Sequence, residues 1–242
     1  MSGFQTSPSP GHQPSVGRYE PIAVSELSTV VAEYSPDREH ESSYQGEADL
    51  ERAFIELLRE QAYEYLPITS EAELVANLRA QLEALNAIEL TDKEWERFFA
   101  EKITGANDGI VEKTARIQED HIQVLKRDDG SFKNVYLIDK QSIHNNRLQV
   151  INQYETGFET LAALTPPPTI RANRYDVTVL VNGLPMVHVE LKRRGVDIRE
   201  AFNQINRYQR ESFWADSGLF QYVQLFVISN GTLTKYYSNT VR

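Results

Sequence analysis

The segment RYDVTVLVNGLPMVHVELKRRG, residues 174–195, constrains the fold of this chain more than any other. It contains two valine-rich runs on either side of Asn182-Gly183, and an Asn-Gly pair between alternating apolar runs is a strong hairpin signal. Valines occupy positions 177, 179 and 181 in the first run, and Val187, Val189 and Leu191 alternate with other residues in the second. The segment therefore predicts two antiparallel strands, each with one valine-rich face.

Burial of both valine-rich faces on one side of the sheet limits how the strands can pair. Opposite residues of an antiparallel pair point to the same side, so uniting the two faces requires paired residue numbers with an even sum. A two-residue loop at Asn182-Gly183 gives a sum of 365, whereas a three-residue loop from Asn182 to Leu184, with Val181 opposite Pro185, gives 366. We therefore predict the three-residue loop, which is a common class.

This register brings three chemically active side chains together. It places Asp176 opposite Glu190, with the Cβ atoms about 5 Å apart, and Lys192 lies on the same face about 7 Å along the strand. Two facing carboxylates repel each other unless they are neutralised, and a hard divalent cation with oxygen ligands neutralises them. The sequence therefore predicts a Mg²⁺ site. The alternative is a solvated Glu190-Lys192 pair at a sheet edge, with Asp176 as a polar residue at the start of its strand.

Charge is distributed unevenly along the chain. The net charge of −10 argues against general coating of nucleic acid, because neutralisation of phosphates is the main source of non-specific affinity. Residues 171–210 nevertheless hold eight Lys and Arg against four Asp and Glu, a local charge of +4, while the remainder sums to −14. This basic segment supplies candidate phosphate contacts, although chance clustering on a solvated face is the alternative. The candidates are Arg193, Arg194, Arg199, Arg207 and Arg210.

Composition excludes several kinds of site. The chain contains no cysteine, so disulfides, thiolate zinc sites and cysteine nucleophiles are excluded. Its five histidines show no metal-ligand spacing, and we assign no role to His188 although it shares a face with Glu190. Apolar residues make up 40% and charged residues 25%, as in soluble globular proteins. Without a signal peptide or an apolar run of about 18 residues, we expect a cytoplasmic protein that contacts no membrane.

The chain divides into three stretches. Residues 1–43 are expected to be a disordered or loosely ordered tail, because the start of the chain is rich in Ser, Pro and Gly. Residues 44–120 are mainly helical in pattern, and residues 130–242 are rich in predicted strands. The first helix begins at Glu47, with a stripe of Leu50, Phe54, Leu57, Leu58 and Gln61 or Ala62. Capping-box patterns start two more helices, at Ser70 with Glu73 and at Thr91 with Glu94.

The second half of the chain mixes strands with helices. We predict a buried strand at NVYLID (134–139), a helix over 197–213, and a strand at 222–230 that pairs through Asn230-Gly231 with TKYYSN. QVINQYE (149–155) fits a short helix or a strand, and Pro166 to Pro168 mark a stiff connector. These elements predict an α/β fold with a mixed central sheet flanked by helices and an N-terminal helical region.

At these residues the sequence resembles the PD-(D/E)xK nuclease superfamily, through Asp176 and Glu190-Leu191-Lys192, with Tyr175 in place of the motif's proline. Gln204 and Tyr208 look like the Q-x-x-x-Y motif of RecB-like members. Several blocks, taken in order, resemble the N-terminal nuclease domain of the R subunit (HsdR) of type I restriction-modification enzymes, from about Tyr44 to the C-terminus. These blocks are GEADLERAFIELL, DGIVEKTARI, VYLIDK, NRYDVTVLVNGLP, VELKRRGVDIREAFNQINRY and FVISNGT.

The resemblance implies a restriction endonuclease-like core and Mg²⁺-dependent cleavage of double-stranded DNA. The chain would act within a complex whose modification (M) and specificity (S) subunits choose the site. In this family Asp176 and Glu190 would hold the metal and Lys192 would position the attacking water. Gln204 and Tyr208 would support the site. Glu47 would add an acidic residue near the metal, although Glu51, one turn later, is the alternative for that role. Tyr208 could instead pack beside Phe202 and Ile205.

The resemblance also implies an adjoining motor that consumes ATP. The sequence has no G-x-x-x-x-G-K-[ST] and ends at Arg242, so we expect the motor domains and ATP use to be absent from this chain. Two other functions remain open. One is a non-catalytic assembly module of the restriction complex, with a vestigial triad. The other is a RecB-like repair exonuclease, which would degrade DNA from its ends.

Overall fold

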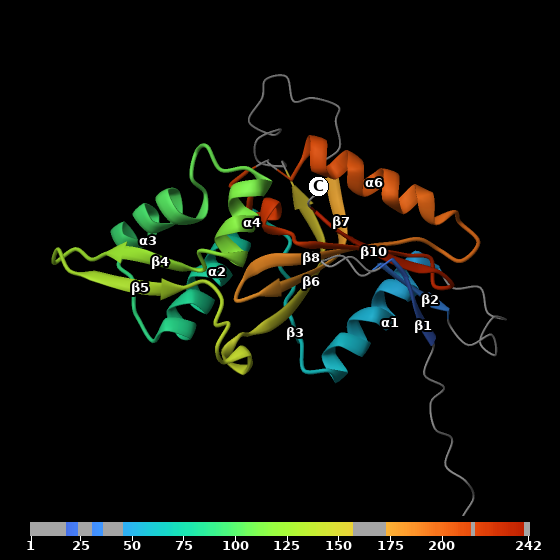
Figure 1. The fold of residues 1–242 in the computed structure, drawn as a ribbon, viewed down its shortest axis with the longest axis horizontal. Coiled ribbons are helices and arrows are strands. Elements are labelled where there is room, and N and C mark those ends of the chain that lie inside the picture. The colour runs from blue at the N-terminus through green and yellow to red at the C-terminus, as the bar shows by residue number, and fades with distance from the viewer. Residues whose placement is uncertain (1–17, 24–30, 36–45, 157–172, 214–215, 240–242) are drawn as a thin grey trace, which may run out of the picture.

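A mixed sheet of eight strands forms the centre of the molecule, in the order β1-β2-β10-β9-β8-β7-β6-β3 (Figure 1). The computed structural model describes residues 18–23, 31–35, 46–156, 173–213 and 216–239. Two pairs, β3 with β6 and β8 with β9, are parallel, and the other pairs are antiparallel. The predicted α/β fold with a mixed central sheet is confirmed.

The strands of the central sheet are β1 (Arg18–Ala23), β2 (Val31–Ser35), β3 (Glu64–Tyr65), β6 (Leu148–Thr156), β7 (Asn173–Val181), β8 (Leu184–Leu191), β9 (Leu225–Ser229) and β10 (Thr234–Ser238). The helices are α1 (Glu47–Glu60), α2 (Glu71–Asn86), α3 (Asp92–Phe98), α4 (Ile110–Gln118) and α6 (Ile198–Glu211), with short helical turns at Phe99–Ile103, Ile143–Asn145 and Leu219–Tyr222. A separate two-stranded ribbon consists of β4 (Ile122–Lys126) and β5 (Phe132–Tyr136).

Helices α1 and α6 cover opposite faces of the central strands (Figure 1). On one face Ile55 of α1 packs with apolar side chains of β6, β7 and β8, namely Val150, Val177, Val189 and Leu191. On the other face Ala201, Ile205 and Tyr208 of α6 join the larger core. Both faces of β7 and β8 are therefore covered along the middle of these strands, where the polar side chains of Thr178, His188 and Glu190 are buried.

The N-terminal helices begin where the capping patterns predict. Ser70 and Thr91 each cap a helix, and both capping boxes are formed, with Glu73 and Glu94 as the reciprocal partners. The predicted stripe of the first helix is confirmed at Leu50, Phe54 and Leu58, which are half-buried. It is wrong at Leu57, which is 55% exposed, and at its end, because α1 stops at Glu60 and residues 61 and 62 are exposed. Ile55, outside the predicted stripe, is buried against the sheet. The stripe was partly misplaced because several positions of an apolar run fit a helical period.

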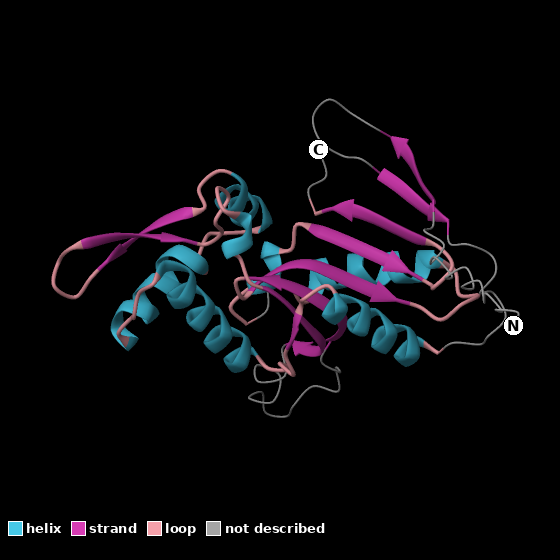
Figure 2. Ribbon diagram, turned by 90° about the horizontal axis from the view of Figure 1, so that it is seen from below, coloured by secondary structure: helices cyan, strands magenta, loops and turns pink. Residues whose placement is uncertain are grey.

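The ribbon of β4 and β5 projects away from the central sheet (Figure 2). The prediction of a buried strand at NVYLID was only partly right, because the strand starts at Phe132 and belongs to this ribbon. Val135 and Leu137 are buried, but Asn134 and Tyr136 face solvent. QVINQYE, left open as helix or strand, lies in β6. The predicted pairing of TKYYSN after Asn230-Gly231 is confirmed as β10 against β9.

The hairpin of β7 and β8 has the predicted pairing but not the predicted loop. Val177 pairs with Val189 and Thr178 with His188, so the numbers sum to 366 as expected. Nearer the turn, however, Val181 pairs with Leu184 and Leu180 with Pro185, so the loop is the two-residue Asn182-Gly183 turn. A bulge between Val179 and Leu180 changes the sum of paired residue numbers from 365 near the turn to 366 farther along the strands. The three-residue loop was therefore wrong, because a bulge can change the register inside a strand.

The expectation of a loosely ordered segment over residues 1–43 concerns positions that lie largely outside the described residues. Within it, Arg18–Ala23 and Val31–Ser35 form strands β1 and β2, which extend the central sheet. The proline connector at 166–168 also lies outside the described residues. Across the part of the chain that the structure describes, no helix has the length and apolar character needed to span a membrane.

Candidate active site

The β7-β8 hairpin brings Asp176, Glu190 and Lys192 together. Asp176 Oδ2 accepts a hydrogen bond of 2.9 Å from the backbone N–H of Leu191, which lies between the other two residues. Lys192 Nζ donates to Glu190 Oε1 at 2.9 Å. The carboxylate on one strand is thus attached to the backbone of the strand that carries the second carboxylate and the ammonium group. This is the clustering that the register predicted.

The pKa of Asp176 is shifted because its carboxyl group is largely buried beside a second carboxylate. Burial, followed by repulsion from Glu190, raises the pKa of Asp176 to about 7. The hydrogen bond from Leu191 and the positive charge of Lys192 act in the opposite direction but do not overcome these effects. The site therefore disfavours a second negative charge at Asp176 beside Glu190.

Lys192 remains a cation in this site. Burial lowers its pKa, but attraction to Glu190 and the hydrogen bond with it outweigh burial, so the pKa lies above its usual value. Asp176 and Glu47 add to the same effect. An ammonium group held this way can donate hydrogen bonds to a developing negative charge, but it is a poor general base.

The oxygen atoms of this site fit a hard divalent cation. Glu190 is fully buried, and its Oε2 atom has no hydrogen-bond partner. An unpartnered buried carboxylate oxygen, together with the raised pKa of Asp176, marks a place where a positive charge would lower the free energy. In the described residues no three His, Asp or Glu side chains cluster as a ready-made cation cage. Asp176 and Glu190 alone would therefore have to supply the side-chain ligands.

Two glutamates of α1 lie beside the carboxylate pair. Glu47 Oε1 accepts a hydrogen bond of 3.3 Å from the backbone N–H of Arg193 and adds to the raised pKa of Lys192. Glu51 hydrogen-bonds to Asn152 and Gln153 of β6 and contributes to the raised pKa of Asp176. The structure therefore places both glutamates next to the site. Glu51, which the sequence left as the competitor of Glu47, thus lies beside the site together with Glu47.

The Q-x-x-x-Y residues connect α6 to β7. Gln204 Nε2 donates to Tyr208 Oη, and Tyr208 Oη donates to the carbonyl oxygen of Arg174 at 2.9 Å. Tyr208 is 2% exposed, and burial followed by the charge of Glu190 raises its pKa to about 12. Its ring packs against Tyr175 and Phe213. Tyr208 therefore holds the strand that bears Asp176 from inside the core, and it does not lie on the surface.

The arginine candidates lie mainly on the solvent side of α6 and the loop before it. Arg193, Arg199, Arg207 and Arg210 are exposed, whereas Arg194 is half-buried. Asp197 caps the helix by accepting a hydrogen bond from the N–H of Arg199 at 2.9 Å. The guanidinium group of Arg207 lies over the ring of Tyr208, 5.4 Å from the ring centroid. The exposed side of α6 and the loop before it thus present several cations to solvent.

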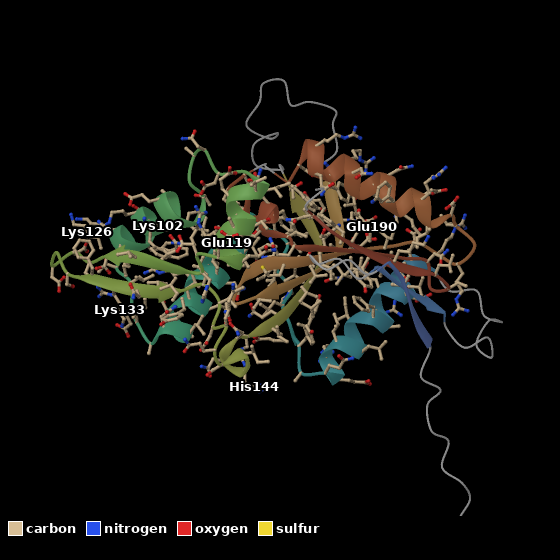
Figure 3. All side chains as sticks on the ribbon, in the orientation of Figure 1. Lys102, Glu119, Lys126, Lys133, His144 and Glu190 are labelled. Carbon is tan, nitrogen blue, oxygen red and sulfur yellow. The ribbon has the colours of Figure 1, made fainter. Side chains whose placement is uncertain are left out.

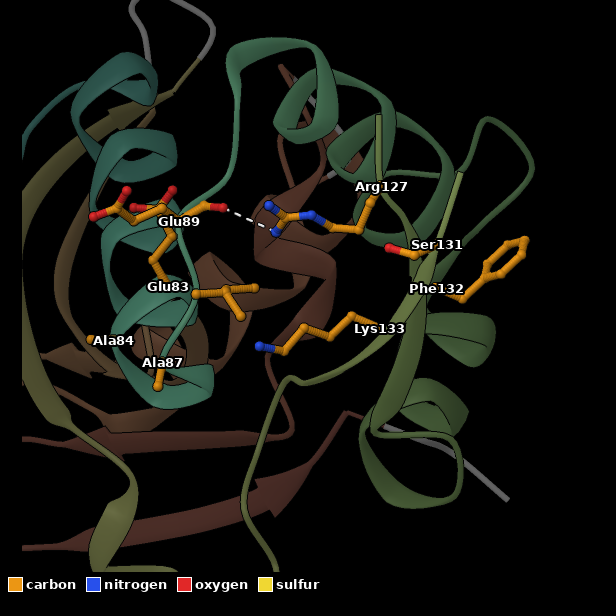
Figure 4. A pocket seen from close by; sticks show the side chains of 9 residues that line it. Glu83, Ala84, Ala87, Glu89, Arg127, Ser131, Phe132 and Lys133 are labelled. Carbon is orange, nitrogen blue, oxygen red and sulfur yellow. Dashed lines mark hydrogen bonds between the residues drawn. The ribbon is translucent and has the colours of Figure 1, made fainter. Parts of the chain in front are cut away.

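A surface groove elsewhere on the molecule lacks this combination of groups. It lies between the end of α2 and the β4-β5 turn and is lined by Glu83, Glu89, Arg127, Phe132 and Lys133 among others (Figure 4). Arg127 already pairs with Glu94 at 3.0 Å and donates to the carbonyl oxygen of Glu89. Glu190 lies on the other side of the molecule from Lys126 and Lys133 (Figure 3). The groove is therefore not part of the carboxylate site.

Comparison with known proteins identifies what the chain is similar to. The family model described as "Type I restriction enzyme R protein N terminus" matches residues 44–242. The type I restriction enzyme EcoprrI endonuclease subunit of Escherichia coli is 47% identical over 224 residues, which cover 92% of this chain and 68% of that subunit. The SsaAORF53P endonuclease subunit of Staphylococcus saprophyticus is 41% identical over 201 residues, or 81% of this chain and 20% of the relative.

Proposed function

Because this chain belongs to the family of type I restriction enzyme R protein N termini, we propose that it is a metal-dependent endonuclease domain that hydrolyses double-stranded DNA. The observation that carries the proposal is the convergence of Asp176, Glu190 and Lys192 on one hairpin. The names of its relatives, which describe endonuclease subunits of type I restriction enzymes, support the same reading.

We assign the reaction to this site as follows. Asp176 and Glu190 would hold Mg²⁺, aided by the carbonyl oxygen of Leu191. When bound, the ion would polarise the scissile phosphate and lower the pKa of a bound water. Lys192 stays charged and would orient the attacking water and stabilise negative charge that develops on the phosphate. The reaction is a direct hydrolysis, so no side chain serves as a covalent nucleophile.

The supporting residues keep these groups in place. Glu47 would order the backbone that follows Lys192, through its hydrogen bond with Arg193. Gln204 and Tyr208 would fix the start of β7 through the carbonyl oxygen of Arg174. Arg193, Arg194, Arg199 and Arg207 would contact phosphates of the DNA, which positions the duplex without reading its sequence.

The setting of this activity is also part of the proposal. The relatives are named as subunits of type I restriction enzymes, so we propose that the chain works in a complex with modification and specificity subunits in the cytoplasm. Cleavage would follow translocation of DNA by ATP-driven motor domains. The chain spans 68% of the E. coli relative but only 20% of the S. saprophyticus relative, and the motor would belong to the part not represented here.

Cleavage of a circular DNA duplex tests the proposal. The assay uses the chain as part of its assembled restriction complex, with Mg²⁺ and ATP, and compares Asp176→Ala and Lys192→Ala with wild type. Lys133→Ala is the matched control, because Lys133 is an exposed lysine on the ribbon. We expect cleavage to fall by at least about 1000-fold in the two site variants and to remain in the control, since each removes a transition-state interaction worth several kcal/mol.

The same assay distinguishes the other two functions. An exonuclease that needs ends would leave the closed circle intact and degrade a linear duplex. A non-catalytic assembly module would support complex formation equally well in all variants, and cleavage would be unaffected by Asp176→Ala and Lys192→Ala. Either result would overturn the proposed endonuclease role.

A further inference from the structure

His188 lies directly beside the candidate metal ligand Glu190, on the same face of β8. Its side chain is fully buried, as is that of Glu190. The His188 Nε2 atom lies 3.6 Å from Glu190 Oε2, slightly beyond hydrogen-bond length. Neither atom has any hydrogen-bond partner. A buried polar atom without a hydrogen bond destabilises the folded state by roughly 1–3 kcal/mol. A hydrogen bond between these two atoms would remove that cost.

Aromatic rings surround His188 and restrict its options. The ring centroids of Tyr175, Phe213 and Phe226 lie 5.2, 5.7 and 6.4 Å from that of the imidazole. The two phenylalanine rings carry no polar atom, and the Tyr175 hydroxyl is engaged with Ser212 Oγ at 2.7 Å. The rings keep the imidazole away from solvent. Glu190 Oε2 is therefore the polar group toward which Nε2 can turn.

The other nitrogen of His188 faces a hydroxyl group. Thr178, which pairs with His188 across the hairpin, places its Oγ1 atom 3.4 Å from His188 Nδ1. A threonine hydroxyl can donate its hydrogen to an unprotonated ring nitrogen, which leaves the proton of a neutral imidazole on Nε2. The Thr178 contact is therefore compatible with the tautomer that can donate to Glu190, and the carboxylate oxygen Oε2, an acceptor without another partner, favours that tautomer.

We propose that His188 is a positioning residue that donates its Nε2–H to Glu190 Oε2 and so holds this carboxylate for the metal. Lys192 engages the other oxygen, Oε1, so the two donors fix the carboxylate plane from both sides. Partners that orient a ligating carboxylate sharpen the metal site, and their loss typically weakens metal binding by about 10–100-fold. The consequence for the metal rests on the proposed function, whereas the hydrogen bond itself does not.

Tyr237 is the competing donor. Its hydroxyl is also buried without a partner, and burial followed by the charge of Glu190 raises its pKa. A hydrogen bond from Tyr237 to Glu190 Oε2 would leave His188 as a packing residue only. The experiment therefore has to separate these two donors.

Nitrogen-15 NMR of the imidazole tests the hydrogen bond in the full chain without metal. We expect the proton on Nε2 and an unprotonated Nδ1, with an Nε2 shift that changes in Glu190→Gln and does not change in Tyr237→Phe. A proton on Nδ1, or an Nε2 signal insensitive to Glu190→Gln, would overturn the proposal.

Binding of Mn²⁺, followed by electron paramagnetic resonance, tests the consequence. His188→Phe fills the aromatic surroundings without a donor and should weaken binding by about tenfold or more. His188→Gln keeps an N–H donor and should recover most of the affinity. Phe213→Leu disturbs packing around His188 without removing a polar atom and should bind as wild type does.

The outcomes separate this inference from the proposed function. Equal Mn²⁺ affinity in folded His188→Phe and Phe213→Leu would reduce His188 to a packing residue, as would a loss of affinity in Tyr237→Phe alone. A wild-type chain that binds no Mn²⁺, yet shows the expected Nε2 signal, would remove the metal site of the proposed function and leave the hydrogen bond established.

Discussion

The backbone N–H of Leu191 donates to Asp176 Oδ2 at 2.9 Å, so the first carboxylate of the site is attached to the strand that carries the second. The geometry of the pair is therefore set by strand pairing and does not depend on a flexible loop. Burial and Glu190 together raise the pKa of Asp176 to about 7.

The contribution of Asp176 to the stability of the metal-free protein should fall as pH rises from about 4 to about 7. In this range the folded state holds the Asp176 proton and the unfolded state has lost it, so the folded state binds more protons and its stability falls with pH. The stabilisation present below pH 4 is lost through the folded pKa near 7. From about 1.4 kcal/mol per pKa unit, the loss is at most about 4 kcal/mol.

Urea unfolding across this range, in wild type and Asp176→Asn, measures the effect. The asparagine can still accept the hydrogen bond from Leu191 but has no charge to titrate, so its profile should be flatter and its stability at pH 8 higher than that of wild type. Parallel profiles for the two proteins would show that Asp176 is not destabilised by its surroundings.

The hairpin turn should tolerate no side chain at Gly183. Gly183 has a φ of +83°, and a Cβ atom there would lie 2.6 Å from Leu78 Cα, a backbone atom of α2. We expect Gly183→Ala to cost at least about 3 kcal/mol, because strain at positive φ adds to a clash that requires α2 to move. Chemical denaturation measures the loss.

Gly130, in the turn of the β4-β5 ribbon, provides the matched control. It has a φ of +86°, but nothing lies within 4 Å of its added Cβ atom. Gly130→Ala should therefore show the cost of strain alone, about 1 kcal/mol. Equal losses in the two variants would mean that the turn is not packed tightly against α2.

The buried Lys113 should make stability rise with pH above neutrality. Lys113 is 2% exposed and donates to the carbonyl oxygen of Gly218 at 2.8 Å and to Gln221 at 2.9 Å. Burial lowers its pKa to about 8, so between about pH 8 and 10 the unfolded state binds more protons and stability increases with pH.

The comparison of wild type with Lys113→Met isolates this contribution. Their difference in unfolding free energy should shift in favour of wild type by roughly 2 kcal/mol between pH 8 and about pH 9.5. Higher pH is avoided because buried tyrosines such as Tyr154 and Tyr175, whose pKa values are raised by burial, then act in the opposite direction. A constant difference would show that Lys113 titrates normally.

The arginines of α6 should contribute to DNA binding through charge alone. If Arg199 and Arg207 each contact one phosphate, replacing both with alanine should reduce the slope of log affinity against log salt by about 2. The loss should be the same for unrelated DNA sequences. Filter binding over a salt series measures the slope, with a Lys126→Ala, Lys133→Ala pair on the ribbon as control. An unchanged slope would place the DNA elsewhere.

Much of the fold could be predicted from sequence because its signals are local. The capping boxes at Ser70 and Thr91 and the alternating valines of the hairpin each depend on neighbouring residues, and the structure has all of them. The three-residue loop was wrong because a bulge changes the pairing partner without a marked sequence signal. The exposed position of Leu57 depends on which strands α1 covers, and this is long-range information.

The site was predictable to the extent that it follows from the hairpin register. Asp176, Glu190 and Lys192 lie within 17 consecutive residues, so pairing alone brings them together. The contributions of Glu51 and Tyr208 depend on α1, α6 and β6 meeting around the hairpin, which no local pattern encodes. Tyr208 therefore proved to be a core residue hydrogen-bonded to the backbone of β7.

Anomalous diffraction from crystals soaked in Mn²⁺ tests the central claim most directly. The account predicts a peak whose ligands include carboxylate oxygens of both Asp176 and Glu190, and its absence in crystals of Asp176→Asn soaked in the same way. Mn²⁺ bound at other carboxylates, with Asp176 and Glu190 in contact only with protein groups, would contradict it.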